Sequence, residues 1–355
     1  MFRNWILKIL LFPFSLIYGF FSVLYSKLYD YNFLNSIKFS LPVINIGNLS
    51  VGGTGKTPHT EYLINLLSPF IKVAVLSRGY KRVTRGFHEV NFHSTTKKVG
   101  DEPLLFKKKY PDIGVFVSES RVEGISQMLM INPGIQTILL DDAFQHREID
   151  PGFNILLTEY DYPFFNDFFL PSGRLREWRS AYKRADIIIF TKCPEGLVES
   201  EKDQLLIKLQ PQRHQKVFFS YYNYFSPYFM YNTGIKTRLK PDHKVLLISA
   251  LASTSYLVSF LESTGCDYYS VEFTDHHEFS FDEMENIKKT FYELKGEDKI
   301  ILTTEKDAMR LNEFKDFILS NDLPVFILPV SVNFLFNTKN EFDAEIKKFL
   351  LDFKV

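Results

Sequence analysis

One segment, residues 42–67, constrains the fold of this chain more than any other. It reads PVINIGNLSVGGTGKTPHTEYLINLL, which is an apolar run, a glycine-rich loop and an amphipathic stretch. The loop has the pattern Ser-x-x-x-x-Gly-Lys-Thr, and it departs from the usual phosphate-binding loop because Ser50 replaces the first glycine. Strand, loop and helix in this order form the phosphate-binding unit of a parallel α/β sheet, so the segment predicts a nucleotide-binding fold.

The residue types of the loop explain how it would hold a nucleoside triphosphate. Glycines let successive backbone N–H groups turn toward phosphate oxygens, and the following helix adds the partial positive charge of its N-terminus. Lys56 would reach the β- and γ-phosphates, and the Thr57 hydroxyl would bind Mg²⁺. We expect the whole loop to contact the nucleotide, namely Ser50, Val51, Gly52, Gly53, Thr54, Gly55, Lys56 and Thr57.

A second segment would complete the nucleotide site. Residues 136–142 read QTILLDD, an apolar strand that ends in two acids. Such a strand places an aspartate on Mg²⁺ opposite the phosphate loop, so Asp141 and Asp142 are candidate metal ligands; an ordinary strand with an acidic turn is the alternative. Guanine recognition would need an aspartate two residues after Lys192, where Pro194 stands. ATP is therefore the expected nucleotide.

From about residue 40 onward, short apolar runs alternate with longer amphipathic stretches. Strands are expected at 42–46, 72–76, 114–117, 137–140, 154–157, 187–190, 216–220, 244–249, 268–273, 299–303 and 324–329. Near-continuous apolar strands separated by helix-length segments predict a mostly parallel sheet with helices on both faces. We therefore expect an α/β fold of the P-loop NTPase type. Its predicted parts are a hydrophobic helix over 1–30, a kinase domain over 31–220 and a smaller α/β domain over 221–355.

The N-terminal segment favours contact with a membrane. Residues 9–26 carry no charge, and Arg3, Lys8 and Lys27 flank them. This length is at the low end of what spans a bilayer. A helix lying in the membrane interface, a spanning helix and a helix buried in the core all remain open, whereas a cleaved signal peptide lacks a good cleavage site. In either membrane arrangement the ATP-using domain faces the cytoplasm.

Charge and cysteine content exclude several classes of function. The chain has 42 Lys and Arg against 42 Asp and Glu, so no net charge attracts nucleic acid. Cys193 and Cys266 are too few and too far apart for a disulfide framework or a zinc site. Basic residues do gather within residues 72–109 and 174–184, which would attract an anionic substrate or an anionic bilayer.

Seven motifs, in order along the chain, resemble the tetraacyldisaccharide 4'-kinase family, the lipid A 4'-kinases known as the LpxK family. They are NIGNLSVGGTGKTP from residue 45, SRGYKR from 77, VGDEP from 99, DDAFQHR from 141, LPSGRLRE from 170, DHHEF from 275 and TTEKDAMRL from 303. Lys81, Ala143 and Trp178 depart from the family pattern without removing a chemically active side chain.

The resemblance implies a lipid kinase that uses ATP and Mg²⁺ at the cytoplasmic face of the bacterial inner membrane. It would phosphorylate the 4'-hydroxyl of a tetraacylated glucosamine disaccharide 1-phosphate and give lipid IVA. The expected partners are this acylated lipid and the membrane surface, with no nucleic acid and no protein partner. Two other readings are a membrane-tethered P-loop ATPase that switches a protein partner and a soluble P-loop kinase of a small metabolite.

The resemblance also implies roles for single residues. Asp101 would take the proton of the acceptor hydroxyl with the assistance of His276, and Lys56 would act on the phosphates; a helix N-cap is the alternative role for Asp101. The residues expected near substrate or phosphate are Arg78, Tyr80, Arg121, Arg176 and Glu177. Surface salt bridges are the alternative for the last three.

Overall fold

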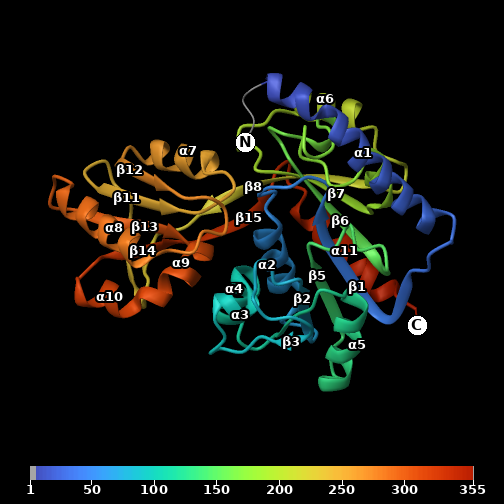
Figure 1. Ribbon diagram of the computed structural model, residues 1–355, viewed down its shortest axis with the longest axis horizontal. Coiled ribbons are helices and arrows are strands. Elements are labelled where there is room, and N and C mark those ends of the chain that lie inside the picture. Colours follow the sequence, from blue (N-terminus) through green and yellow to red (C-terminus); the bar gives the residue numbers. More distant parts are fainter. Residues whose placement is uncertain (1–4, 355) are drawn as a thin grey trace.

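Two sheets, each covered by helices, make up the chain in the computed structural model, which describes residues 5–354 (Figure 1). Arg3 lies outside the described residues. The larger sheet has nine strands in the order β15-β8-β7-β6-β1-β5-β2-β4-β3. Its strands are β1 (Ile37–Asn48), β2 (Val73–Ser77), β3 (His88–Glu89), β4 (Gly114–Val117), β5 (Thr137–Asp141), β6 (Ile149–Glu159), β7 (Ile187–Thr191), β8 (Lys216–Tyr224) and β15 (Val330–Phe334).

The larger sheet is mostly parallel, as its apolar strands predicted. β1 pairs in parallel with both β5 and β6, and antiparallel pairing occurs where β3 joins β4 and where β15 joins β8. Helices cover both faces, so β2, β5 and β7 are buried along their whole length, as is the second half of β1. The helices of this unit are α1 (Trp5–Asp30), α2 (Lys56–Leu67), α3 (Thr96–Val99), α4 (Asp101–Lys109), α5 (Arg121–Ile131), α6 (Glu199–Leu209) and α11 (Lys339–Asp352), with 3₁₀ turns at Phe164–Asn166 and Arg179–Arg184.

The second sheet has six strands in the order β10-β9-β14-β13-β11-β12. They are β9 (Tyr228–Phe229), β10 (Asn232–Lys236), β11 (Lys244–Ser249), β12 (Asp267–Glu272), β13 (Lys299–Thr304) and β14 (Val325–Leu328). The helices of this unit are α7 (Ser255–Thr264), α8 (Phe281–Glu293), α9 (Glu305–Leu311) and α10 (Lys315–Ser320), with a 3₁₀ turn at Asn312–Phe314. A P-loop-type α/β fold with a second α/β unit is thereby confirmed.

The two units are joined by a pair of antiparallel strands. β8 leaves the larger sheet toward the second unit, and β15 returns beside it, with Val330 opposite Tyr224 and Phe334 opposite Ser220. After β15 the chain continues into α11, which packs on the larger sheet. The division at residue 220 stays a prediction as a statement about folding units. β15 is a strand of the larger sheet and α11 packs on that sheet, so residues 330–352 lie with the first unit and not with the second.

Helix α1 lies along the outside of the larger unit (Figure 1). It is long and apolar enough to cross a membrane. One face is docked: the Ser15 hydroxyl accepts a hydrogen bond from the backbone N–H of Ser172 at 2.9 Å, and Gly19 packs on the Phe169 ring, where a Cβ atom would collide. The other face is exposed, including Ile9, Leu10, Phe14, Leu16, Phe20 and Phe21. The alternative of a helix buried in the core is therefore wrong.

Candidate active site

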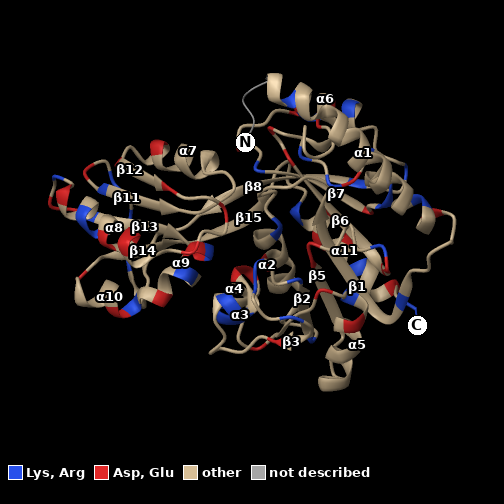
Figure 2. Cartoon of the chain, in the orientation of Figure 1, with Lys and Arg blue, Asp and Glu red and all other residues tan. Residues whose placement is uncertain are grey.

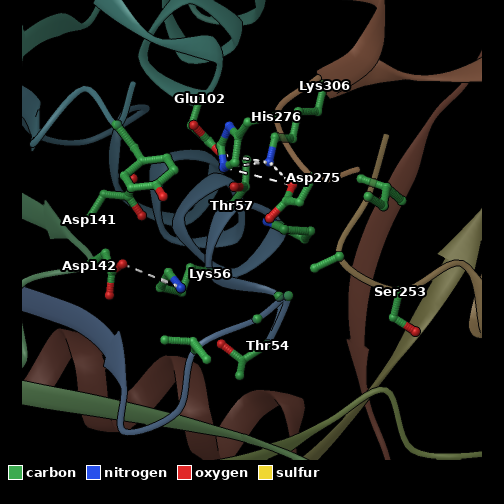
Figure 3. Close-up of a pocket in the computed structure, with 18 of the residues that line it drawn as sticks. Thr54, Lys56, Thr57, Glu102, Asp141, Asp142, Ser253, Asp275, His276 and Lys306 are labelled. Carbon is green, nitrogen blue, oxygen red and sulfur yellow. Dashed lines mark hydrogen bonds and ion pairs between the residues drawn. The ribbon is translucent and has the colours of Figure 1, made fainter. Parts of the chain in front are cut away.

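A cavity of about 850 Å³ lies between the two sheets. The phosphate loop and the acids after β5 line one side, and Ser253, Asp275, His276 and Lys306 of the second unit line the other (Figure 3). Helix α1 also contributes to its wall through Tyr18, Phe21, Ser22 and Tyr25. A ligand in this cavity therefore touches both units and the exposed helix at once.

The phosphate loop runs from the end of β1 to the start of α2, as the sequence predicted. Residues 51–57 all line the cavity, whereas Ser50 is buried beside Leu175 and does not. Gly55 ends the loop with a φ of 87°, a left-handed conformation that glycine adopts without a steric penalty. The loop is anchored from behind, because the Asn48 amide donates to the Thr54 hydroxyl at 2.7 Å.

His59, in the first turn of α2, fixes the loop to the linking strands. Its Nδ1 lies 2.7 Å from the Gly55 carbonyl oxygen, and its Nε2 lies 3.0 Å from the Ser220 hydroxyl of β8. Since a carbonyl oxygen can only accept, Nδ1 carries the proton. Burial lowers the pKa of His59 to about 4, so the ring is neutral. Sequence reasoning missed this residue.

The two acids after β5 occupy different environments. One oxygen of Asp141 accepts from the Ser77 hydroxyl at 3.1 Å, and the other is buried without a hydrogen-bond partner among the described residues. Burial, then the charges of Glu102 and Asp142, raise the pKa of Asp141 to about 7. An orphaned buried oxygen beside a second carboxylate fits a divalent cation, which would supply the missing partner.

Asp142 is held by two cations. Lys56 Nζ lies 3.5 Å from one of its oxygens, and Arg176 donates to both, at 3.2 and 2.8 Å. Although burial alone raises the pKa of Asp142, the charges of Lys56 and Arg176 lower it well below the usual range. Asp142 is therefore ionised, and its φ of 54° turns the side chain toward the loop lysine.

Arg121, Arg176 and Glu177 take three different positions. Arg176 lines the cavity beside Asp142. Glu177 also lines the cavity, but both of its oxygens are paired with Arg184. Arg121 is fully buried behind the acids, where it donates to the backbone oxygens of Asp141 and Asp142 at 3.4 and 3.2 Å. In this structure, then, Arg121 has no surface with which to touch a phosphate.

The SRGYKR motif places two expected substrate residues at the cavity wall. Arg78 and Tyr80 both line the cavity. The Tyr80 ring is more than half exposed, and its centre lies 4.9 Å from the centre of the His276 ring. Tyr80 is thus close enough to the second unit to contact a ligand bound beside His276.

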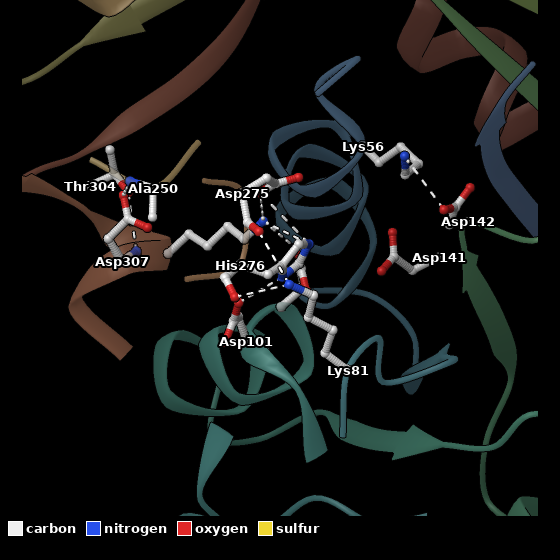
Figure 4. A network of polar contacts seen from close by, with 12 residues as sticks. Lys56, Lys81, Asp101, Asp141, Asp142, Ala250, Asp275, His276, Thr304 and Asp307 are labelled. Carbon is white, nitrogen blue, oxygen red and sulfur yellow. Dashed lines mark hydrogen bonds and ion pairs between the residues drawn. The ribbon is translucent and has the colours of Figure 1, made fainter. Parts of the chain in front are cut away.

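Asp101 and His276, 175 residues apart in sequence, are hydrogen-bonded (Figure 4). His276 Nδ1 lies 2.9 Å from one oxygen of Asp101, and Arg310 Nε donates to the other at 2.7 Å. Asp101 begins α4 but makes no capping hydrogen bond, and Gly100 is the N-cap, so the capping alternative is wrong. Asp101 is only 1% exposed; His276 and the neighbouring Glu102 are the residues that line the cavity.

Lys306, which the sequence did not single out, lies among the polar groups around His276. Its ammonium group is 2.9 Å from Glu102, 3.2 Å from Asp275 and 3.2 Å from His276 Nε2. Burial alone lowers the pKa of Lys306, but the Glu102 and Asp275 charges outweigh it and raise the pKa. For Glu102, burial alone would raise the pKa, but the charges of Lys306 and His276 outweigh burial and lower the pKa to about 2. In the sequence, the signal for Lys306 was its position four residues before Arg310, a spacing that places both side chains on one face of a helix.

The comparisons of this chain with known proteins all find the same kind of protein. A family model described as tetraacyldisaccharide-1-P 4'-kinase matches residues 7–351. The tetraacyldisaccharide 4'-kinase of Bacteroides thetaiotaomicron is 43% identical over 349 residues, covering 95% of this chain and 91% of that one. That of Flavobacterium johnsoniae is 40% identical over 345 residues, covering 97% and 98%. The crystal structure of LpxK from Aquifex aeolicus in complex with ATP is similar with a TM-score of 0.74 and 28% identity, covering 97% of this chain and 99% of that one.

Proposed function

The chain belongs to the tetraacyldisaccharide-1-P 4'-kinase family, and from this membership we propose that it transfers the γ-phosphoryl group of ATP to the 4'-hydroxyl of a tetraacylated glucosamine disaccharide 1-phosphate. The product is lipid IVA, an intermediate of lipid A. The observation that carries this function is the single cavity that joins the phosphate loop to the Asp101–His276 pair. The family match, and not the cavity, argues against the protein-switch and small-metabolite readings.

The nucleotide side of the cavity holds and neutralises the triphosphate. Residues 51–57 line the cavity, and the loop N–H groups that make no bond within the protein would face the phosphates; those of Val51 and Thr54 donate to the Arg174 and Gly52 carbonyl oxygens at 2.8 and 3.1 Å. Lys56 would place its charge on the β- and γ-groups. Asp141, Asp142 and the Thr57 hydroxyl would hold Mg²⁺, which when bound supplies further charge neutralisation at the phosphates. Arg176 positions the side chain of Asp142, and Arg121 positions the backbone of the two acids from behind.

The acceptor side removes the proton of the sugar hydroxyl. Asp101 takes it with the assistance of His276, and the 2.9 Å hydrogen bond makes the two side chains act as one base. His276 is the member of the pair that lines the cavity, so the hydroxyl meets the pair on that side. Arg78 and Tyr80 are placed to contact the lipid headgroup beside it.

Helix α1 would hold the enzyme in the cytoplasmic interface of the inner membrane. Its exposed face is apolar, and Figure 2 shows few charges along it. The opposite face is tied to the polar body from the Lys8 carbonyl, which accepts from Ser172, to Asp30, which pairs with Arg147. Because a helix docked along its length cannot also cross the bilayer, we propose that it lies flat in the interface. Its cavity-lining residues then bring the acyl chains beside the reacting centre.

A phosphorylation assay tests this function. Purified protein with Mg-ATP and the acylated disaccharide 1-phosphate in mixed micelles should give the 4'-phosphorylated lipid, and Lys56→Ala should abolish the product. Lys208→Ala, on the exposed surface of α6, is the matched control and should behave as the wild type. Equal product from wild type and Lys56→Ala, or ATP hydrolysis without lipid product, would falsify the proposal.

A further inference from the structure

Two cations of helix α9, Lys306 and Arg310, enclose the Asp101–His276 pair from opposite ends. They are four residues apart, so they lie on one face of the helix. Arg310 Nε donates to one oxygen of Asp101 at 2.7 Å, and Lys306 Nζ lies 3.2 Å from Nε2 of His276. Within the described residues, these contacts and the 2.9 Å bond between Asp101 and His276 form one continuous chain. Figure 4 shows Asp101 and His276 side by side.

The chain of hydrogen bonds has only one consistent direction. A charged ammonium group can donate but not accept, so Nε2 of His276 accepts from Lys306 and carries no proton. The ring proton is therefore on Nδ1, which donates to Asp101. The carboxylate accepts from the ring on one oxygen and from the Arg310 guanidinium on the other. These contacts thus define one tautomer of the imidazole, with the ring proton on Nδ1.

From this geometry we propose that Lys306 and Arg310 are positioning residues of the phosphoryl-transfer reaction: they hold the Asp101–His276 pair in one tautomer with Nε2 free of a proton, and the acceptor hydroxyl takes the place of the Lys306 ammonium group at Nε2 when it binds. The inference rests on the proposed function for its kinetic consequence, but not for the tautomer that it assigns. It gives the TTEKDAMRL motif a task, because both residues come from that segment and each contacts one member of the pair, Lys306 from the cavity wall and Arg310 from outside the cavity lining.

Within residues 5–354, Lys306 and Arg310 are the cations whose side chains contact the side chains of the pair. Asp101 is faced by His276 and Arg310, with Asp307 of α9 nearby. His276 is faced by Asp101 and Glu102 from α4, by Asp275 and Lys306 from the second unit, and by the Tyr80 ring. Lys81 reaches only the backbone oxygens of Asp275 and His276. Without Lys306 and Arg310, several acids would surround the ring and favour its protonation.

The kinetic test is the pH profile of kcat/KM for lipid phosphorylation. Arg310→Met should move the acidic limb to higher pH by about 1 unit or more, because a carboxylate that loses an adjacent cation binds a proton more readily. Arg310→Lys keeps the charge and should restore the limb to within a few tenths of a unit, even if kcat stays reduced. KM for ATP should change less than about twofold, since the nucleotide side is built on the other sheet. An unmoved limb in Arg310→Met would overturn the proposal.

The matched control is Glu313→Ala. Glu313 accepts a hydrogen bond from Thr96 at 2.7 Å and lies 3.7 Å from Lys97, so it joins the second unit to the first without contacting the pair. Its loss should leave the acidic limb in place. If Glu313→Ala shifts the limb as far as Arg310→Met does, the effect of α9 is general docking of the two units and the positioning role is wrong.

The tautomer is tested without activity, by ¹⁵N NMR of the histidine rings, with His276→Gln used to assign the signal. Wild type should show the ring proton of His276 on Nδ1. Lys306→Met should raise the pH at which the His276 ring protonates by at least one unit. Protonated Nε2 in the wild type, or an unchanged titration in Lys306→Met, would refute the assignment. A wild type with the expected ring signal but no lipid product would instead remove the proposed function alone.

Discussion

The two halves of the cavity are built in opposite ways. The nucleotide half comes from one sheet: the phosphate loop follows β1, the acids follow β5, and these strands are parallel neighbours whose carboxyl ends meet. The acceptor half needs both sheets, because Asp101 begins α4 in the larger unit, whereas His276 and Arg310 come from the second. Nucleotide binding is therefore a property of one sheet, and catalysis is a property of how the two sheets pack.

The largest expected effect separates these halves directly. Asp101→Asn should lower kcat by about 10²- to 10⁴-fold, because the amide cannot accept the hydroxyl proton. The affinity for ATP, measured by nucleotide titration, should stay within about threefold of the wild type. Lys56→Ala should lower both kcat and the affinity for ATP. An Asp101→Asn protein that no longer binds ATP would show that the halves are not independent and that Asp101 is structural.

Acid should damage the nucleotide half through His59. Its pKa in the folded protein, about 4, is below the ordinary value of 6.5, so the unfolded chain binds the extra proton first. Stability is therefore complete above pH 6.5 and falls as the pH is lowered toward 4, by a total of about 3 kcal/mol. Denaturant melts across this range should show the loss, and His59→Asn should flatten it. An equally steep loss in His59→Asn would assign the acid sensitivity elsewhere.

Charges placed on the exposed face of α1 should affect the lipid substrate and leave the nucleotide half unaffected. Leu16→Glu and Phe20→Glu place a charge on its exposed apolar face, and each should weaken binding to anionic vesicles by about tenfold or more. The KM for lipid should rise while the KM for ATP is unchanged. Glu199→Gln, on the exposed surface of α6, is a control that should alter neither quantity. Vesicle binding that persists in both α1 variants would locate the membrane contact on another surface.

The smallest expected effect lies where the halves meet. Lys109 of α4 pairs with Glu61 of α2 and with Glu305 of α9, each at 2.7 Å. Burial first, and then the Glu305 charge, raise the pKa of Glu61 to about 7 from its ordinary 4.5, against the opposing charge of Lys109. The folded state therefore loses stability as the pH rises from 4.5 to 7. Glu61→Gln should remove this loss and gain about 1 kcal/mol at pH 8 in denaturant melts. Destabilisation of the variant at pH 8 would mean that the ion pair outweighs the cost of burial.

The same contrast explains what the sequence could and could not predict. Lys56, Asp141 and Asp142 follow from local patterns, because a loop after one strand and acids after its neighbour must meet at one sheet edge. The strands foreseen from apolar runs are present, whereas four strands were missed, namely β3, β9, β10 and β15. All residues of β10 are exposed, and β3 and β9 have two residues each, so none of these three carries an apolar run. No periodicity could reveal that Asp101 meets His276, since that contact depends on the packing of the second sheet.

Burial was the other property that residue types did not reveal. Arg121 was expected near substrate or phosphate from the family resemblance, yet it is enclosed behind Asp141 and Asp142 and donates to their backbone oxygens. Ser50 completes the loop pattern but faces inward. For Lys306 and Arg310 the helical spacing was visible in the sequence, but the groups they would meet were not.

The return of the chain through β15 affects how the protein is made on the ribosome. α11 follows the second unit in the chain, yet its Phe342 and Ile346 are buried in the core of the larger unit, and Asp343 accepts a hydrogen bond from Tyr62 of α2 at 2.7 Å. The second unit is thus translated completely before α2, the helix that follows the phosphate loop, can pack against α11. During synthesis the later-encoded unit can fold first, and the nascent chain acquires a finished ATP site only after translation has passed α11.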